Sequence, residues 1–254
     1  MKEARAKKVD WHPYVVESEE FRELQFGDWD VQSKMCKAAP NELVLGYTQA
    51  MMGFMLFHPE PRDVLIAGLG GGSLSKFCHL HLPNSRITTV EISQEVIALR
   101  NDFCIPQDSE RFRIIHDDIA SYLDGKDAIA DVILLDGYDQ WGIPTSISDQ
   151  LFYSSCMRAI REGGMLVANL NLGAMSIAPC AKRLLELYKG RDITIRSFLG
   201  YNDIFFGFQD DELPDLTHLK QVATTLTNKT GVDFLRVLGE MRVGTSWSRA
   251  VASS

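Results

Sequence analysis

The segment V64-L-I-A-G-L-G-G-G-S-L74 decides the fold of this chain. It is an apolar run that ends in three closely spaced glycines, Gly68, Gly70 and Gly72, and a second strand-like segment, R86-I-T-T-V-E91, follows it and ends in an acidic residue. Glycines permit a tight turn and a close approach of backbone to ligand, and a carboxylate can accept hydrogen bonds from ribose hydroxyls. The pattern predicts a strand–helix–strand unit that binds the nucleoside of an adenosine-containing cofactor.

The spacing of these glycines separates two classes of cofactor. Ser73 stands where the G-x-G-x-x-G pattern of NAD enzymes has its third glycine. The spacing G68-x-G70-x-G72 is instead similar to the loop of S-adenosylmethionine-dependent transferases, and NAD is the minor alternative. A turn that only joins a strand to a helix is the other alternative, but the order of strand, glycines, helix and acidic residue favours a cofactor site.

Length and composition bound the class of protein. A chain of 254 residues can bury one substantial core, and 45% apolar with 24% charged residues is ordinary for a globular protein. No apolar run reaches membrane-spanning length, and the charged start M1-K-E-A-R-A-K-K8 has no apolar segment after it, so neither a membrane protein nor a secretory signal is predicted.

The net charge and the cysteines limit which binding partners and which cellular compartment are expected. The net charge of −8 argues against nucleic acid as a partner and mildly suits a cationic substrate. The five cysteines are scattered, odd in number and without any C-x-x-C pair, so neither a disulfide framework nor a zinc site is expected. A cytoplasmic protein is predicted.

The remaining segments predict an α/β fold of the Rossmann-like transferase type. Residues 20–34 alternate around G27-D28 as a β-hairpin does, and residues 43–57 read as a buried helix. Five parallel strands are expected, at 64–67, 86–91, 112–116, 131–135 and 165–169. Helices are expected between them, at 74–81, 94–103, 120–123 and 149–160.

The C-terminal part completes this prediction. Residues 192–198 and 203–208 are expected to form an antiparallel pair of strands, and the chain from Pro214 onward is expected to be helical. The predicted division of the chain is therefore 1–55 for the tail, the hairpin and the start of a connecting helix, and 56–254 for the Rossmann-like catalytic domain.

Carboxylates gather where the predicted parallel strands end. Glu91 ends the second strand, Asp117 and Asp118 follow the third, and Asp136 and Asp139 follow the fourth. Carboxyl ends of parallel strands meet at one edge of a sheet, so these acids are expected to lie together. For Asp118, capping of the next helix is an equal alternative. Two nearby carboxylates can attract a cationic amine and take its proton, which indicates group transfer to an amine.

From residue 20 to residue 208 the chain resembles the spermidine synthase (aminopropyltransferase) family. The resemblance is carried by five motifs: V31-Q-S33, V90-E91, H116-D-D118, D131-V-I-L-L-D-G-Y-D139 and Y201-N-D-I-F-F-G-F208. It implies a small N-terminal β domain on a Rossmann-like domain, a homodimer, and transfer of the aminopropyl group of decarboxylated S-adenosylmethionine to a polyamine or related amine, without a metal.

The resemblance also implies residue roles. Gln32 would touch the nucleoside, Glu91 would hold ribose and Asp117 would contact adenine. Asp136 would be the catalytic aspartate and Asp139 the amine-binding one. The tyrosines are expected around the amine: Tyr47 near the position of an active-site tyrosine, Tyr201 lining the amine pocket, and Tyr138 against its methylene chain, with a loop-anchoring role as the alternative for Tyr138.

The chain departs from the family pattern at three places. The glycine loop of the family carries an aspartate that disfavours the carboxylate of intact S-adenosylmethionine, and Gly71 stands at the matching position. Gln140 replaces a proline before W141-G-I-P144, and the N-terminal portion is short. A methyltransferase that uses S-adenosylmethionine and a non-catalytic protein that binds nucleosides or polyamines therefore remain alternatives.

Overall fold

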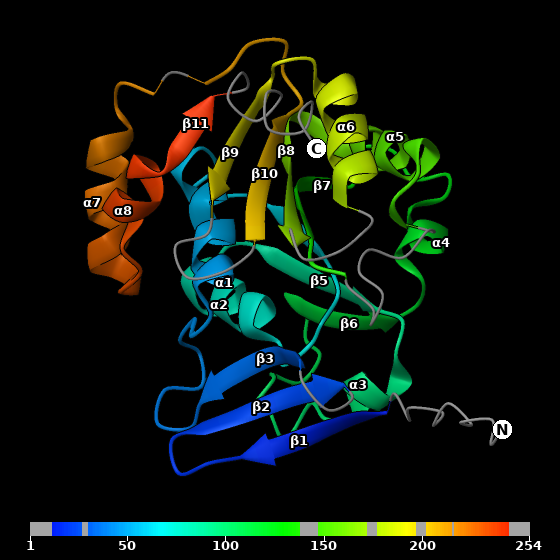
Figure 1. The fold of residues 1–254 in the computed structure, drawn as a ribbon, viewed down its shortest axis with the longest axis vertical. Helices are drawn as coiled ribbons and strands as arrows, with labels where there is room; N and C mark the ends of the chain where they lie inside the picture. The colour runs from blue at the N-terminus through cyan, green and yellow to red at the C-terminus, as the bar shows by residue number, and fades with distance from the viewer. Residues whose placement is uncertain are drawn as a thin grey trace, which may run out of the picture.

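The computed structural model describes residues 12–26, 30–137, 147–171, 177–196, 202–214 and 216–243. Within them the chain forms two sheets, which Figure 1 shows one above the other. The smaller sheet has the order β1-β2-β3, and the larger has the order β11-β9-β10-β8-β7-β4-β5-β6. The predicted α/β class, with a mostly parallel sheet, is confirmed.

The smaller sheet is formed by the N-terminal strands, all antiparallel. Their bounds are β1 Pro13–Glu17, β2 Phe21–Phe26 and β3 Asp30–Cys36. The predicted hairpin is the pair β2 and β3, and β1 adds a strand that the sequence pattern did not predict. The buried inner face includes Leu24 and Met35, and Tyr14, Val16 and Val31 are exposed.

Five strands of the larger sheet run parallel, as predicted. They are β4 Asp63–Ala67, β5 Arg86–Glu91, β6 Phe112–His116, β7 Ala130–Leu135 and β8 Ile160–Asn171. Three antiparallel strands extend the sheet beyond β8, namely β9 Asp192–Arg196, β10 Asn202–Phe208 and β11 Met241–Val243. The predicted pair of C-terminal strands is thus present, and β11 corrects the expectation that the chain is only helical after Pro214.

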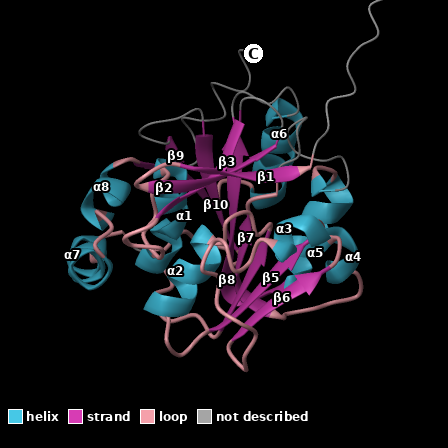
Figure 2. Ribbon diagram, turned by 90° about the horizontal axis from the view of Figure 1, so that it is seen from below, coloured by secondary structure: helices cyan, strands magenta, loops and turns pink. Residues whose placement is uncertain are grey.

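Helices cover both faces of this sheet. Figure 2 shows one group on one side, α1 Gly46–Met51, α2 Ser73–His81, α7 Leu219–Thr230 and α8 Phe234–Gly239. The other side carries α4 Ile119–Leu123, α5 Gln150–Ala159 and α6 Ile177–Tyr188. The remaining helices are α3 Gln94–Ala98 and the 3-10 helix η1 Met52–Leu56.

The two faces of the sheet explain the near-continuous apolar runs of its strands. In β7, Val132 and Leu134 join the core on the α1 and α2 side, whereas Ile133 and Leu135 join the core on the α5 and α6 side. Successive side chains of a strand point to opposite faces, and a parallel sheet covered on both faces needs apolar residues at every position. The sheet is therefore the centre of two cores rather than one.

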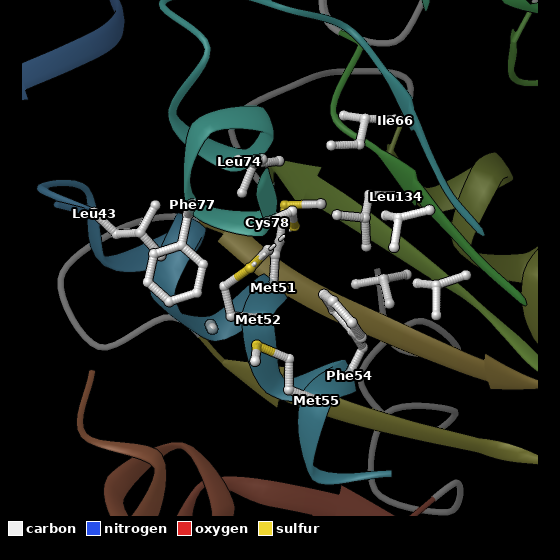
Figure 3. Packing of buried hydrophobic residues seen from close by; sticks show 14 of the residues in the cluster. Leu43, Met51, Met52, Phe54, Met55, Ile66, Leu74, Phe77, Cys78 and Leu134 are labelled. Atoms are coloured by element: carbon white, nitrogen blue, oxygen red, sulfur yellow. Dashed lines mark hydrogen bonds between the residues drawn. The ribbon is translucent and has the colours of Figure 1, made fainter. Parts of the chain in front are cut away.

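The predicted helix over 43–57 is present in two pieces, α1 and η1. Its methionines, Met51, Met52 and Met55, are fully buried, and Figure 3 shows them beside Phe77 and Cys78 of α2. The unbranched thioether side chain fills irregular gaps, which suits this junction between a helix and the sheet. The interpretation of these methionines as core residues is confirmed.

Candidate active site

The candidate site lies where the strand order of the sheet changes direction. From β4 the chain proceeds through β5 and β6 on one side and then crosses to β7 and β8 on the other. In open α/β sheets, ligands bind outside the carboxyl ends of the strands at such a point. The glycine loop after β4 and Asp136 after β7 both lie there, and the backbone N–H of Asp136 donates to the carbonyl oxygen of Ala67 at 2.9 Å.

Two glycines of the loop are required by both conformation and space. Gly68 has φ +94°, and a Cβ on it would lie 2.4 Å from the backbone oxygen of Asp136. Gly72 has φ +70°, and a Cβ there would lie 2.6 Å from Ile105 Cγ1. At Gly70, with φ +51°, a Cβ would meet Ser33 only at ordinary contact distance. The loop therefore brings backbone rather than side chains to the sheet edge.

Glu91 connects this loop to the next strand. Its side chain is buried, and its two carboxylate oxygens each accept a backbone N–H, from Leu69 at 2.8 Å and from Ser93 at 2.8 Å. A carboxylate has about four lone-pair positions, so it retains acceptor capacity after these two bonds. Glu91 is thus held rigidly beside the glycine loop, where it can still accept hydrogen bonds from a bound group.

Asp117 and Asp118 follow β6 at the same edge, and both are half-buried. The backbone N–H of Asp117 donates to the carbonyl oxygen of Glu91, and its Oδ1 accepts the N–H of Asp118 at 2.8 Å. Asp118 is the N-cap of α4, since its Oδ1 accepts the N–H of Ala120 at 2.7 Å. The capping interaction is present, and a contact of Asp118 with a cofactor stays a prediction.

Asp136 is the half-buried carboxylate at the centre of the site. Its Oδ1 accepts a hydrogen bond from Asn169 Nδ2 at 2.8 Å, and its Oδ2 accepts one from the hydroxyl of Tyr47 at 3.2 Å. Removal from water raises the pKa of Asp136, and the hydrogen bonds from Asn169 and then Tyr47 offset part of that rise. The result is a carboxylate more basic than an exposed aspartate.

A further amide contributes to this arrangement. Asn202, the first residue of β10, donates its Nδ2–H to Asn169 Oδ1 at 2.8 Å. The sequence prediction included neither asparagine. Asn169 had a detectable signal, because it is a polar residue at the end of the apolar strand segment M165-L-V-A-N169. Nothing in the sequence pattern pairs Asn202 with it.

The place of Gly71 is closed by two side chains. A Cβ on Gly71 would lie 2.7 Å from Ser33 Oγ and 2.8 Å from Phe103 Cδ1. Phe103 is fully buried, and its carbonyl oxygen accepts a hydrogen bond at 2.7 Å from Nζ of Lys76, a buried residue of α2. The space that a side chain at position 71 would need is therefore taken by the hydroxyl of Ser33 and the ring of Phe103.

The structure brings most of the predicted site residues to one end of the molecule and leaves others undescribed. Gln32 lies half-buried on β3, next to Ser33. Tyr138, Asp139 and Tyr201 lie outside the described residues, as do Gln140 and the segment 141–144. Their predicted roles stay predictions.

The described residues include neither a metal-binding cluster nor a membrane-spanning helix. Over these ranges, no group of three or more His, Cys, Asp or Glu side chains is arranged to hold a metal ion. No helix within them combines the length and apolarity needed to cross a membrane.

The sequence comparisons with known proteins point to one family. A family model for the spermine/spermidine synthase domain matches residues 44–173. The polyamine aminopropyltransferase of Neisseria meningitidis serogroup A / serotype 4A is 36% identical over 235 residues, which cover 91% of this chain and 89% of that protein. The corresponding enzyme of Chromobacterium violaceum is 34% identical, with 89% and 88% covered.

A solved structure shows the same fold. The probable spermidine synthase of Corynebacterium glutamicum aligns with a TM-score of 0.70 over 95% of this chain and 90% of that one, at 19% sequence identity. At this identity the similarity concerns the arrangement of helices and strands, and the sequence comparisons carry the family assignment.

Proposed function

Because the chain belongs to the spermine/spermidine synthase family, we propose that it transfers an aminopropyl group from decarboxylated S-adenosylmethionine to a polyamine or related amine. The observation that carries the proposal is the environment of Asp136. An amine is an ammonium ion near neutral pH and must lose a proton before it can act as a nucleophile. The raised pKa of Asp136 suits a group that first attracts this ammonium and then accepts its proton.

The proposed reaction is a direct displacement. The free amine attacks the carbon bonded to the sulfonium sulfur, the carbon–sulfur bond breaks with its electrons going to sulfur, and methylthioadenosine leaves. Asp136 receives the proton of the amine. Because the sulfonium is already an activated leaving group, proximity and charge stabilisation supply most of the acceleration, and the step requires no metal.

The other predicted residues hold the two substrates in this proposal. The nucleoside would be bound by Gln32, Glu91, Asp117 and the glycine loop. Asp118, the N-cap residue of α4, would also contact the cofactor. The role proposed for Glu91 is supported by its hydrogen bonds to the backbone of Leu69 and Ser93, which fix its position, and by the acceptor capacity that its carboxylate retains. The amine would lie between Tyr47, Asp139, Tyr138 and Tyr201.

We propose further that the protein works as a cytoplasmic homodimer on small-molecule amines. Five free cysteines are compatible with a reducing compartment, and the net charge of −8 favours cationic partners over nucleic acid. The exposed apolar side chains of Tyr14, Val16 and Val31 on the N-terminal sheet offer a surface for a second copy.

Methyl transfer from intact S-adenosylmethionine is the second candidate, because Gly71 lacks the negative charge that would disfavour a cofactor carboxylate. Only the attacked carbon differs between the two reactions. Binding of a nucleoside without turnover is the third candidate.

One experiment separates the three. The purified protein is incubated with decarboxylated or intact S-adenosylmethionine and a panel of di- and triamines, and the products are identified by mass spectrometry. An aminopropylated amine is the expected product. A methylated product would establish the second candidate instead. If methylthioadenosine raises the melting temperature but no product forms, the third candidate holds.

A further inference from the structure

We infer that Asn202 is a positioning residue for Asp136: it holds the side-chain amide of Asn169 so that the amide N–H, and not its oxygen, faces the carboxylate. The inference deepens the proposed function and rests on the role given there to Asp136. It concerns a hydrogen-bonded series that runs across three strands, from Asn202 to Asn169 to Asp136.

Strand register explains why these three side chains meet. In the parallel pair β7 and β8, Leu135 lies opposite Ala168, so Asp136 and Asn169 are the next residues along both strands. In the antiparallel pair β8 and β10, Asn169 lies opposite Ile204. Asn202 is two residues before Ile204 and therefore on the same face, at the diagonal distance that a side-chain amide can span.

Donor and acceptor chemistry gives the series a direction. An ionised carboxylate only accepts hydrogen bonds, so Asn169 supports it only with its NH₂ group. An asparagine amide that turns by 180° would instead direct its oxygen at the carboxylate, which is repulsive. Asn202 opposes that turn, because its own N–H donates to the Asn169 oxygen at 2.8 Å. Asn169 is buried, so water does not readily replace this donor.

The arrangement has consequences for proton transfer. Around Asp136, the described side chains that are hydrogen-bonded to it are Tyr47 of α1 and Asn169 of β8, and of these only Tyr47 is titratable. A hydrogen bond donated to a carboxylate favours its charged form. Loss of the correctly oriented Asn169 amide should therefore make Asp136 harder to ionise and weaken the attraction for the substrate ammonium.

The first variant is Asn202→Asp, which keeps the size and shape of the side chain, replaces its donor by an acceptor and adds a negative charge. Asn169 is then expected to turn its NH₂ toward position 202 and its oxygen toward Asp136. We expect the acid limb of kcat/KM for the amine to move to higher pH by about one unit, so that kcat/KM at a fixed pH on that limb falls about tenfold. Asn202→Ala, which removes the donor without adding an acceptor, should give a smaller shift in the same direction.

A matched control and a second readout keep the result interpretable. Asn228→Asp makes the same substitution on the exposed surface of α7 and should leave the pH profile unchanged. Methylthioadenosine should raise the melting temperature of Asn202→Asp as much as that of the wild type, because the nucleoside site is not involved. A purely structural role would instead lower the melting temperature with no change in the pH profile, and that outcome would overturn the inference.

The inference can fail separately from the proposed function. Titration of the Asp136 carboxyl carbon by ¹³C NMR does not depend on turnover. The uncharged variant Asn202→Ala, which adds no negative charge beside Asp136, should raise the pKa of Asp136 relative to the wild type. An unchanged titration rejects the role of Asn202 even if the wild type makes an aminopropylated product. If the wild type makes no such product, the proposed function fails, while a shifted titration still supports the role of Asn202.

Discussion

At the scale of single residues, the burial that makes Asp136 a stronger base is also expected to lower the stability of the fold. Its pKa is raised because it is withdrawn from water, while Asn169 and Tyr47 supply only partial compensation. A folded-state pKa above the unfolded value means that ionisation at neutral pH weakens the folded state. The carboxylate is therefore expected to be costly for folding.

Asp136→Asn tests this directly. We expect transfer activity to fall at least 100-fold, because a general base contributes on the order of 10² to 10⁴. We expect the melting temperature at pH 7 to rise, since the amide has no charge to desolvate. Near pH 3 the wild-type aspartate is protonated in both states, so the difference should vanish there. Asp124→Asn, at an exposed position after α4, is the control that should change neither property.

Gly71 replaces an aspartate of the family motif, and the packing around it leaves no room for a side chain at this position. Gly71→Ala should destabilise the protein by about 1–3 kcal/mol, because the Cβ would enter the space of Ser33 and Phe103. Its φ lies outside the left-handed region, so the expected loss is steric and not conformational.

Thermal melts of a small set of variants check this expectation. Gly71→Ala combined with Ser33→Gly should lose less stability than the sum of the two changes, because the second removes one of the clashes. Gly239→Ala is the matched control, since a Cβ there meets nothing within 4 Å, and it should be neutral or slightly stabilising. An unaffected melting temperature for Gly71→Ala would contradict the steric explanation.

At the scale of elements, α2 carries a charge into the core. Lys76 is 1% exposed, and Nζ donates to the carbonyl oxygen of Phe103 and to Met35 Sδ. Burial lowers the pKa of Lys76 to about 8, although Cys104 acts weakly in the opposite direction. The helix that follows the glycine loop is thus attached by this lysine both to β3 and to the chain after α3.

Lys76→Met should reveal that charge through the pH dependence of stability. The folded pKa of about 8 lies below the unfolded value, so the wild type binds fewer protons when folded, and its stability should rise between pH 8 and about 10.5. The methionine variant lacks this rise. Its stability relative to the wild type should therefore fall by about 3 kcal/mol from pH 7 to pH 10.5 in urea unfolding. Lys182→Met, an exposed change on α6, should show no such trend.

The element predictions succeeded where periodicity and strand ends were strong. Each of the five parallel strands was found. β4, β7 and residues 165–168 of β8 are apolar runs with side chains in both cores. β5 and β6 are short segments rich in β-branched residues. β1 was missed because a five-residue edge strand has no burial pattern of its own until it pairs with β2. The helix predicted over 94–103 ends at Ala98, and the chain then turns through Cys104, which has a positive φ of 54°.

At the scale of the whole molecule, hydrogen bonds and ion pairs connect the amino ends of the parallel strands, at the end of the sheet opposite the candidate site. Asp131 is the second residue of β7. Its side chain accepts hydrogen bonds from the backbone N–H groups of Arg62 and Asp63 and forms an ion pair with Arg161. Burial works against its ionisation, but the hydrogen bonds from Asp63, Arg161 and Arg62 outweigh burial and lower the pKa of Asp131. This network connects β4, β7 and β8 at their starts.

Asp131→Asn should weaken the fold in a pH-dependent way. A lowered folded-state pKa gives stability that is present above the unfolded value of about 4 and is lost as the pH falls through the folded value. We expect a loss of about 1.5–3 kcal/mol at pH 7, typical of hydrogen bonds to a charged group, and a much smaller loss near pH 2. Urea unfolding at the two pH values provides the measurement. Asp127→Asn, which breaks an exposed ion pair with Arg158, should cost less than about 1 kcal/mol at either pH.

The site itself was only partly predictable at this scale. Strand ends and spacing located Glu91, Asp117 and Asp136 at one edge, because parallel strands end together. Tyr47 was expected at the active site from the family resemblance, but its hydrogen bond to Asp136, 89 residues away in sequence, was not predicted. Asn169 and its partner Asn202 were not predicted, and Asn202 lies on a strand that enters the sheet in the opposite direction. Such contacts depend on register between strands, which a single sequence does not specify.

The strand order of the large sheet also governs how the chain can be made. β9 leaves the ribosome before β10, yet β10 lies between β8 and β9 in the finished sheet. Until the residues of β10 are synthesised, the backbone of β8 has an open edge and β9 has no neighbour on that side. A nascent chain released before Phe208 would therefore combine an incomplete site with an aggregation-prone edge, and synthesis of this short strand is the step that removes both.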